Sequence, residues 1–255
     1  MVTCALLRPA SRPALVTSAP GAQEGPPSDV KLTLTHTRTP DWATQLSHRL
    51  RYRVVLKFVG ISAFMWVFFS AYFYLLRHPG GQVTSMPLTA LDHWVPFQSN
   101  AIAAYVSLWV YVGIPPGLML RTRDALTYGA WAAALCAAGL LMFLLWPTAV
   151  PTEWRSVGVE GHAGFALLRG IDASGNAFPS LHVATATFSA FWIQRMLRIV
   201  GAPRTLSAMN GLWLLLIVHS TIATRQHVVL DAVGGVLLAL PFAWASMRWW
   251  RPGPR

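Results

Sequence analysis

Residues 227–250 have the sequence HVVLDAVGGVLLALPFAWASMRWW. Apart from Asp231 and a few residues near its end, the stretch is apolar, and as a helix it is long enough to cross a hydrocarbon core of about 30 Å. Ionisable groups inside apolar spans are costly, so they mark functional positions. The stretch therefore predicts a membrane helix that carries chemistry at one end. Gly234 and Gly235 predict a close contact between this helix and a neighbour.

The composition of the whole chain agrees with a membrane protein. Of 255 residues, 54% are hydrophobic and 11% are charged, whereas soluble domains carry about 25% charged residues. Two cysteines cannot build a disulfide scaffold or a zinc site. The net charge of +11 does not indicate nucleic-acid binding, because no basic helix with base-reading residues is present. We expect no nucleic-acid partner.

Six apolar stretches approach or exceed the length of a membrane span, which predicts an all-α, polytopic six-helix transmembrane bundle. They are residues 54–76, 99–120, 126–146, 180–197, 206–223 and 228–250. We expect residues 54–250 to form the six-span catalytic membrane domain.

The flanking segments differ in composition from the spans. Residues 1–40 are rich in Pro, Ser, Thr, Ala and Gly without apolar periodicity, which predicts a flexible cytoplasmic tail, with a targeting peptide as the alternative. In residues 41–53, apolar side chains recur every four residues beside three arginines, which predicts a short interfacial amphipathic helix. An exposed charged linker is the alternative there. Residues 251–255 form a cytoplasmic C-terminal tail in this scheme.

Basic residues predict the topology, because Lys and Arg near span ends stay in the cytoplasm. With six spans both termini share one side, and most of the basic residues fall on it. The opposite side carries only Arg77, Arg155, Arg169 and Arg225. We therefore expect cytoplasmic termini, with the loops 77–98, 147–179 and 223–227 facing the exterior. The alanine-rich composition, with Arg favoured over Lys, suggests a bacterial inner membrane, whose exterior is the periplasm.

Two polar clusters are candidates for chemistry on the exterior face. Asp231 lies four residues after His227, one helical turn away, and could orient one imidazole nitrogen while the other is free to attack. A buried pair that only joins helices is the alternative. In the second cluster, Asn176 to His182, Pro179 suits the first turn of a helix whose free amides attract phosphate. Ser180 adds a hydroxyl donor there.

These residues carry a resemblance to a known family. The segment GNAFPSLHVA at 175–184, followed by Ser220, His227 and Asp231 at the spacing Ser-x6-His-x3-Asp, resembles the type 2 phosphatidic acid phosphatase superfamily, which includes the vanadium haloperoxidases. Its first motif, Lys-x6-Arg-Pro, is absent here, and Thr221 stands where the third motif has Arg. These departures are similar to the inositol phosphorylceramide synthase-like branch and its bacterial relatives. The stretches LDHWVPF at 91–97 and PTAVP at 147–151 are also similar to that branch.

The resemblance implies a role for each matching residue. His227 would be the nucleophile that forms a phosphohistidine, Asp231 its orienting carboxylate and His182 the general acid and base. Ser180 and Ser220 would contribute to phosphate binding. Because the family's cations are missing, Arg225, Arg155 and Arg169 are the candidates to replace them. No metal and no cofactor are expected.

The sequence thus predicts a lipid phosphate phosphatase or phosphotransferase with its site at the exterior face. Its partners would be a lipid phosphate or phospholipid substrate and the bilayer itself. Two alternatives remain: an inositolphosphotransferase-type enzyme that moves a head group to a lipid alcohol, and an inactive transporter or scaffold on the same fold.

Overall fold

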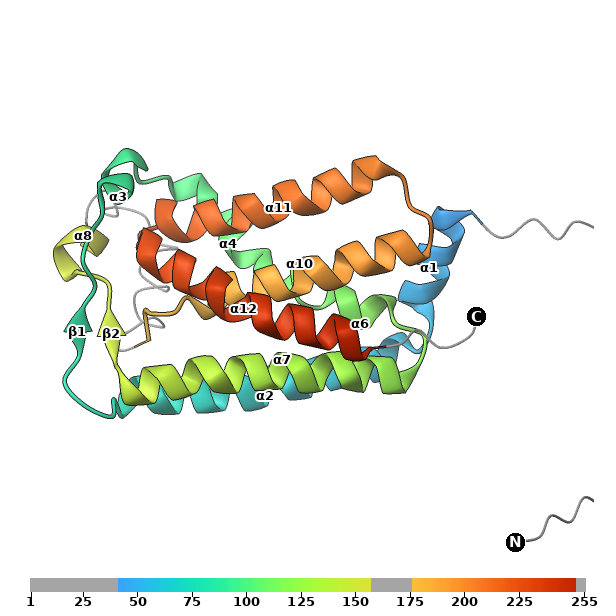
Figure 1. Ribbon diagram of the computed structural model, residues 1–255, viewed down its shortest axis with the longest axis horizontal. Coiled ribbons are helices and arrows are strands. Elements are labelled where there is room, and N and C mark those ends of the chain that lie inside the picture. The colour runs from blue at the N-terminus through green and yellow to red at the C-terminus, as the bar shows by residue number, and fades with distance from the viewer. Residues whose placement is uncertain (1–40, 157–175, 251–255) are drawn as a thin grey trace, which may run out of the picture. The chain divides into compact units, whose positions relative to one another are not determined.

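The computed structural model describes residues 41–156 and 176–250, and this part of the chain is mostly helical (Figure 1). Four helices are long and apolar enough to cross a membrane: α2 (Val54–Arg77), α7 (Thr122–Leu145), α11 (Arg204–Ala223) and α12 (Val229–Trp249). Each lies within a few residues of a predicted span. The prediction of a helical chain with apolar, membrane-length helices is confirmed, whereas the count of six spans stays a prediction. Arg169 and the two predicted tails, 1–40 and 251–255, lie outside the described residues.

Helix α10 (Leu181–Ile199) lies inside the bundle and packs against α12, α11 and α7. Twelve of its 19 residues are buried. It is not among the four apolar helices, because His182, Gln194 and Arg195 make it more polar. Its position in the bundle removes these polar groups from lipid, as expected for a helix that carries functional side chains.

The predicted span 99–120 is interrupted in the structure. It consists of η1 (Ser99–Ala101), α4 (Ile102–Val106), α5 (Leu108–Tyr111) and α6 (Ile114–Leu118). The junction residues Ser107 and Val112 keep right-handed helical dihedral angles, so the chain continues in the same direction. The two prolines of α6 lack the N–H groups that a regular helix needs, which accounts for part of the irregularity.

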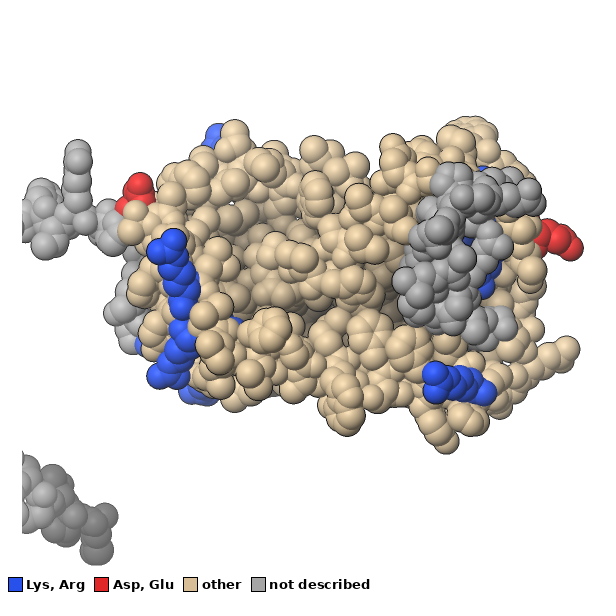
Figure 2. Space-filling model, turned by 180° about the vertical axis from the view of Figure 1, so that it is seen from behind, with Lys and Arg blue, Asp and Glu red and all other residues tan. Residues whose placement is uncertain are grey.

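The two ends of the bundle differ in their side chains. One end, which we call the arginine end, holds α1 (Trp42–Arg51) and the starts of α2, α7 and α11 (Figure 1). Its exposed arginines are Arg51, Arg53, Arg121, Arg123, Arg198, Arg204 and Arg248. The middle of the face shown in Figure 2 has neither basic nor acidic side chains, as a lipid-facing belt requires. Helix α1 forms where an interfacial helix was predicted, and its place at the interface stays a prediction.

The opposite end, which we call the histidine end, holds the starts of α10 and α12 together with α3 (Ala90–Trp94) and α8 (Thr152–Ser156). Strands β1 (Thr84–Ser85) and β2 (Thr148–Ala149) pair in parallel here, a small exception to the predicted all-α fold. Thr148 also bridges to Asn176, and its hydroxyl oxygen accepts a hydrogen bond from the Phe178 amide at 2.7 Å. This framework fixes the loop that leads into α10.

Glycines bring α12 close to the start of α10. A Cβ atom added at Gly235 would collide with the carbonyl oxygen of Ser180, and one at Gly234 would collide with the ring of Phe178. Only glycine permits this approach of the two backbones. The predicted close packing at both glycines is confirmed, and it holds the two polar clusters side by side.

Candidate functional site

His227 lies in the turn between α11 and α12. Its backbone N–H donates to the carbonyl oxygen of Thr221 at 3.0 Å, as does that of Gln226 at 3.1 Å. Arg225 has a left-handed backbone with a φ of 61°, which lets the chain reverse within a few residues. The turn predicted between the two spans is therefore present. His227 therefore lies in the predicted loop 223–227, and Asp231 lies in the first turn of α12, which begins at Val229.

The His227 side chain nevertheless faces Asp231, in the first turn of α12. Nδ1 of His227 lies 3.4 Å from Oδ2 of Asp231, and both side chains are buried. The same oxygen accepts a hydrogen bond from the backbone N–H of Val228 at 3.0 Å, which fixes the carboxylate at the helix start. Nδ1 therefore faces the carboxylate, and Nε2 is the ring nitrogen left for other chemistry.

His182 lies in the first turn of α10, as predicted. Its ring stacks on Tyr105, with 4.0 Å between centroids and 13° between planes, and meets the ring of Trp109 edge-on at 5.3 Å. Its Nε2 lies 3.2 Å from the carbonyl oxygen of Tyr105. Tyr105 and Trp109, both in the interrupted segment 99–120, therefore fix the orientation of the imidazole ring.

Ser180 is the N-cap of α10, and its hydroxyl oxygen accepts a hydrogen bond from the Val183 N–H at 3.3 Å. Its own backbone N–H donates to the carbonyl oxygen of Asp231 at 3.0 Å. This bond joins the start of α10 directly to the start of α12. Pro179 precedes the N-cap, so the expectation that it occupies the first helical turn is wrong: Ser180 supplies the capping oxygen that ends the loop.

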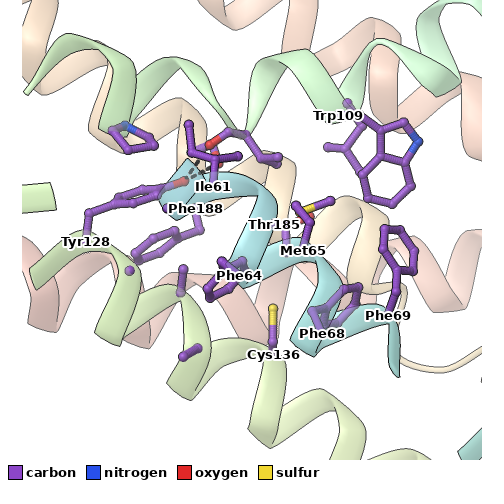
Figure 3. Close-up of a pocket in the computed structure, with 18 of the residues that line it drawn as sticks. Ile61, Phe64, Met65, Phe68, Phe69, Trp109, Tyr128, Cys136, Thr185 and Phe188 are labelled. Atoms are coloured by element: carbon purple, nitrogen blue, oxygen red, sulfur yellow. Dashed lines mark hydrogen bonds between the residues drawn. The ribbon is translucent and has the colours of Figure 1, made fainter. Parts of the chain in front are cut away.

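The two histidines line one cavity of about 1420 Å³. Its walls come from α2, the segment 102–119, α7 and α10. Figure 3 shows aromatic side chains of α2, among them Phe64 and Phe68, together with Cys136 of α7. A pair of histidines on a mainly apolar lining is the arrangement expected for a ligand with a polar head and an apolar tail.

Arg225 is buried, with 5% of its surface exposed, and contacts an aromatic ring. Its Cζ lies 3.4 Å from the centroid of the Trp154 ring, a cation–π contact, and Nη1 lies 3.5 Å from the carbonyl oxygen of Asp92. Burial lowers the pKa of the guanidinium, and the negative charge of Asp92 acts in the opposite direction. Arg225 is not among the residues that line the cavity.

The other predicted phosphate ligands occupy different surroundings. Arg155 is half-buried in α8. Ser220 is buried in α11, and its hydroxyl donates to the Ile217 carbonyl oxygen at 2.6 Å. Thr221, at the position where the family has Arg, donates its hydroxyl to the Val218 carbonyl oxygen at 2.8 Å. Such bonds to the preceding helical turn are usual for Ser and Thr inside helices.

Asp92 is a functional candidate that the sequence analysis did not identify. Its side chain is fully buried, and its Oδ1 accepts a hydrogen bond from the Val229 N–H at 2.7 Å. Oδ2 accepts from both the amide and the hydroxyl of Thr89, each at 2.7 Å. The carboxylate therefore ties α3 to the start of α12, beside His227. The capping pattern Thr-x-x-Asp at 89–92 is a signal that could have located the helix, although not its partner.

Among the described residues, no group of three or more His, Cys, Asp or Glu side chains could hold a metal ion.

The sequence was compared with protein families and with known proteins. One family, described as the PAP2 superfamily, matches residues 85–245, more than half of the chain. The match includes Asp92, His182, Arg225, His227 and Asp231. The comparisons with curated proteins and with solved structures gave no match.

Proposed function

This chain belongs to the PAP2 superfamily, and from that membership we propose that it is a membrane phosphatase or phosphotransferase that acts on a lipid phosphate through a phosphohistidine. One observation carries the proposal. His227, oriented by Asp231 at 3.4 Å, and His182 line the same cavity although one lies in the turn before α12 and the other in the first turn of α10.

In the first half-reaction, Nε2 of His227 attacks phosphorus and the ester P–O bond breaks. His182 gives its proton to the departing alkoxide. In the second half-reaction, water or an alcohol attacks the same phosphorus and the P–N bond breaks, while His182 takes up the proton of the attacking hydroxyl. In the structure, Nε2 of His182 lies 3.2 Å from the Tyr105 carbonyl oxygen. Proton transfer therefore requires either a rotation away from Tyr105 or the use of Nδ1.

Phosphoryl transfer also requires positive charge or hydrogen-bond donors around the equatorial oxygens. We propose the amides at the start of α10 and the Ser180 hydroxyl as donors, since Ser180 is held against Asp231. Arg225, Arg155 and Arg169 remain the proposed cations. For Arg225 this role requires the guanidinium to leave Trp154, on which it stacks at 3.4 Å.

A head-group transferase of the inositol phosphorylceramide synthase type is the second candidate. The residue at position 221 favours this candidate, because that branch also lacks the arginine of the third motif. The Thr221 hydroxyl is bonded within α11 and provides no substitute for the arginine. An inactive scaffold is less well supported, since the buried charged groups gather around the two histidines.

The proposal is tested by release of phosphate from a panel of lipid phosphates by purified protein, with and without an acceptor alcohol. Hydrolysis without acceptor supports a phosphatase, and a phosphorylated or head-group-bearing product formed only with acceptor supports a transferase. No turnover under either condition would contradict both.

We further propose that the histidine end faces the exterior, in bacteria the periplasm, with both termini in the cytoplasm. The unequal distribution of exposed arginines between the ends supports this orientation. Cysteine tags at Ser156 should be labelled by an impermeant reagent from outside intact cells, and tags at Arg123 or Gly201 should not. The reverse pattern would place the site in the cytoplasm.

A further inference from the structure

The cavity is much longer than the histidine site needs. Its lining extends along α2 from Arg53 to Phe73. At about 1.5 Å per residue this is a helical rise of about 30 Å. The hydrocarbon core of a bilayer is also about 30 Å thick, so one leaflet supplies about 15 Å. The cavity therefore has the depth of both leaflets.

Its two ends differ and its walls between them are apolar. His182 and His227 line one end, and Arg53, Lys57 and Arg121 line the other. Lys57 donates to the carbonyl oxygens of Arg49 and Gly117, at 2.6 Å each. These bonds join α2 to the ends of α1 and α6 at this end of the cavity. Phe64 and Phe68 of α2 line the cavity and are half-buried, so they pack on protein and still leave part of their surface open to the cavity. Figure 2 shows the middle of this face hollowed.

We infer that the cavity holds the apolar chain of the substrate along its whole length, so that the preferred substrate is a lipid phosphate whose chain reaches across both leaflets. This inference rests on the proposed function, because the phosphate is placed at the histidines. An unfilled apolar cavity lacks van der Waals contacts on its lining, and a chain that fills it restores them. Only a chain that reaches the arginine end restores all of them, which favours long chains over short ones.

Two glycines allow the distal half of the cavity to be filled selectively. Gly60 of α2 and Gly129 of α7 both line the cavity, and a Cβ atom at either position would have no atom within 4 Å. Gly60 lies six residues after the start of α2, and Gly129 lies seven residues after the start of α7. Both glycines are therefore about 10 Å from the arginine end of the cavity. Gly60→Leu and Gly129→Leu therefore add apolar side chains at the far half of the cavity, at positions where the Cβ atom itself meets nothing. Gly211→Leu in α11 is the matched control, because it is equally open and does not line the cavity.

The experiment compares octyl, dodecyl, hexadecyl, docosyl and triacontyl phosphates in detergent micelles. For the wild type, we expect kcat/KM to rise along the whole series. Gly60→Leu and Gly129→Leu should lower kcat/KM for triacontyl phosphate about tenfold, through KM, and leave octyl phosphate unchanged. Gly211→Leu should leave the whole series unchanged. A wild-type preference that levels off at dodecyl phosphate, or equal losses for all chain lengths, would overturn the inference and leave the proposed function standing.

A second measurement does not depend on turnover. A triacontyl phosphonate with a diazirine near the middle of its chain should crosslink to peptides around Gly60 and Gly129 on illumination. The crosslink should disappear when unlabelled triacontyl phosphonate competes. Crosslinks confined to peptides of the histidine end, or insensitive to competition, would show that the chain does not follow the cavity.

Discussion

The two ends of the bundle use polar residues in opposite ways. At the arginine end the charges are exposed, and seven arginines of the described residues surround the helix termini. At the histidine end lie eleven of the fourteen buried polar side chains of the described residues, including every buried Asp, Arg and His among them: Asp92, Arg225, His227 and Asp231. Exposed cations suffice to orient a membrane protein. Buried charges are costly, so their concentration at one end indicates chemistry there.

The comparison also separates two kinds of helix. The apolar helix α2 has only one fully buried residue, Leu76, whereas the more polar α10 is largely buried. This inverts the rule for soluble proteins, because lipid is the solvent of the outer surface. Polar residues are therefore kept inside the bundle and brought to one end of it.

The largest expected difference between the ends concerns histidine. His227→Ala should abolish turnover, because the proposed covalent bond to phosphorus is made by this side chain. His48→Ala at the arginine end, an exposed residue of α1, is the control and should keep wild-type activity. Phosphate release by the purified variants checks both. Equal rates would show that the histidine end has no catalytic nucleophile.

A smaller loss is expected for the orienting carboxylate. Asp231→Asn should keep the fold and lower the rate about 10²–10⁴-fold, as expected when the imidazole is held in the wrong tautomer. Asp124→Asn, in the first turn of α7 at the arginine end, is the matched control. A rate close to wild type in Asp231→Asn would identify the pair as structural.

The contact between α10 and α12 should be sensitive to one methyl group. Gly235→Ala places its Cβ against the Ser180 carbonyl oxygen, and we expect a loss of stability of about 1–3 kcal/mol. Gly211→Ala, where nothing lies within 4 Å, should not lower stability. Thermal unfolding in detergent measures both variants. A Gly235→Ala protein as stable as the control would mean that the two helices are not in tight contact.

The smallest expected effect separates buried from exposed cations. Arg225→Ala should lower the rate about tenfold more than Arg77→Ala, which is about 1.4 kcal/mol of transition-state stabilisation. Arg225 is buried beside the turn that carries His227, whereas Arg77 is exposed at the end of α2. Arg225→Lys should recover part of the loss, because it restores the charge without the planar fork. Steady-state rates that are equally and slightly reduced in both alanine variants would leave Arg155 and Arg169 as the candidates.

The sequence predicted the elements that depend on local composition. Apolar runs located α2, α7, α11 and α12, because span length follows from bilayer thickness. The spacing of His227 and Asp231 predicted their contact, although it is made between a turn and a helix start rather than within one helix. The break in the second span was not predicted, since hydropathy records apolarity and not the loss of hydrogen bonds at Pro115 and Pro116.

The rest of the site depends on contacts between distant parts of the chain. Asp92 meets Val229 across 137 residues and Arg225 across 133, and a single sequence carries no signal for such pairs. The stacking of Arg225 on Trp154 could not be predicted for the same reason. The phosphate-binding role of Ser220 stays a prediction of the motif, and the structure adds that its hydroxyl donates to a carbonyl oxygen of the preceding helical turn.

The central claim is that the histidine end forms a covalent bond to phosphorus, and rapid-quench labelling tests it most directly. Wild-type protein exposed briefly to a lipid phosphate with radiolabelled phosphorus should carry an acid-labile, base-stable label on the peptide that contains His227. The label should be absent from His227→Ala and present in the His48→Ala control. Turnover by the wild type without a label at any quench time, or a label that persists in His227→Ala, would contradict the account.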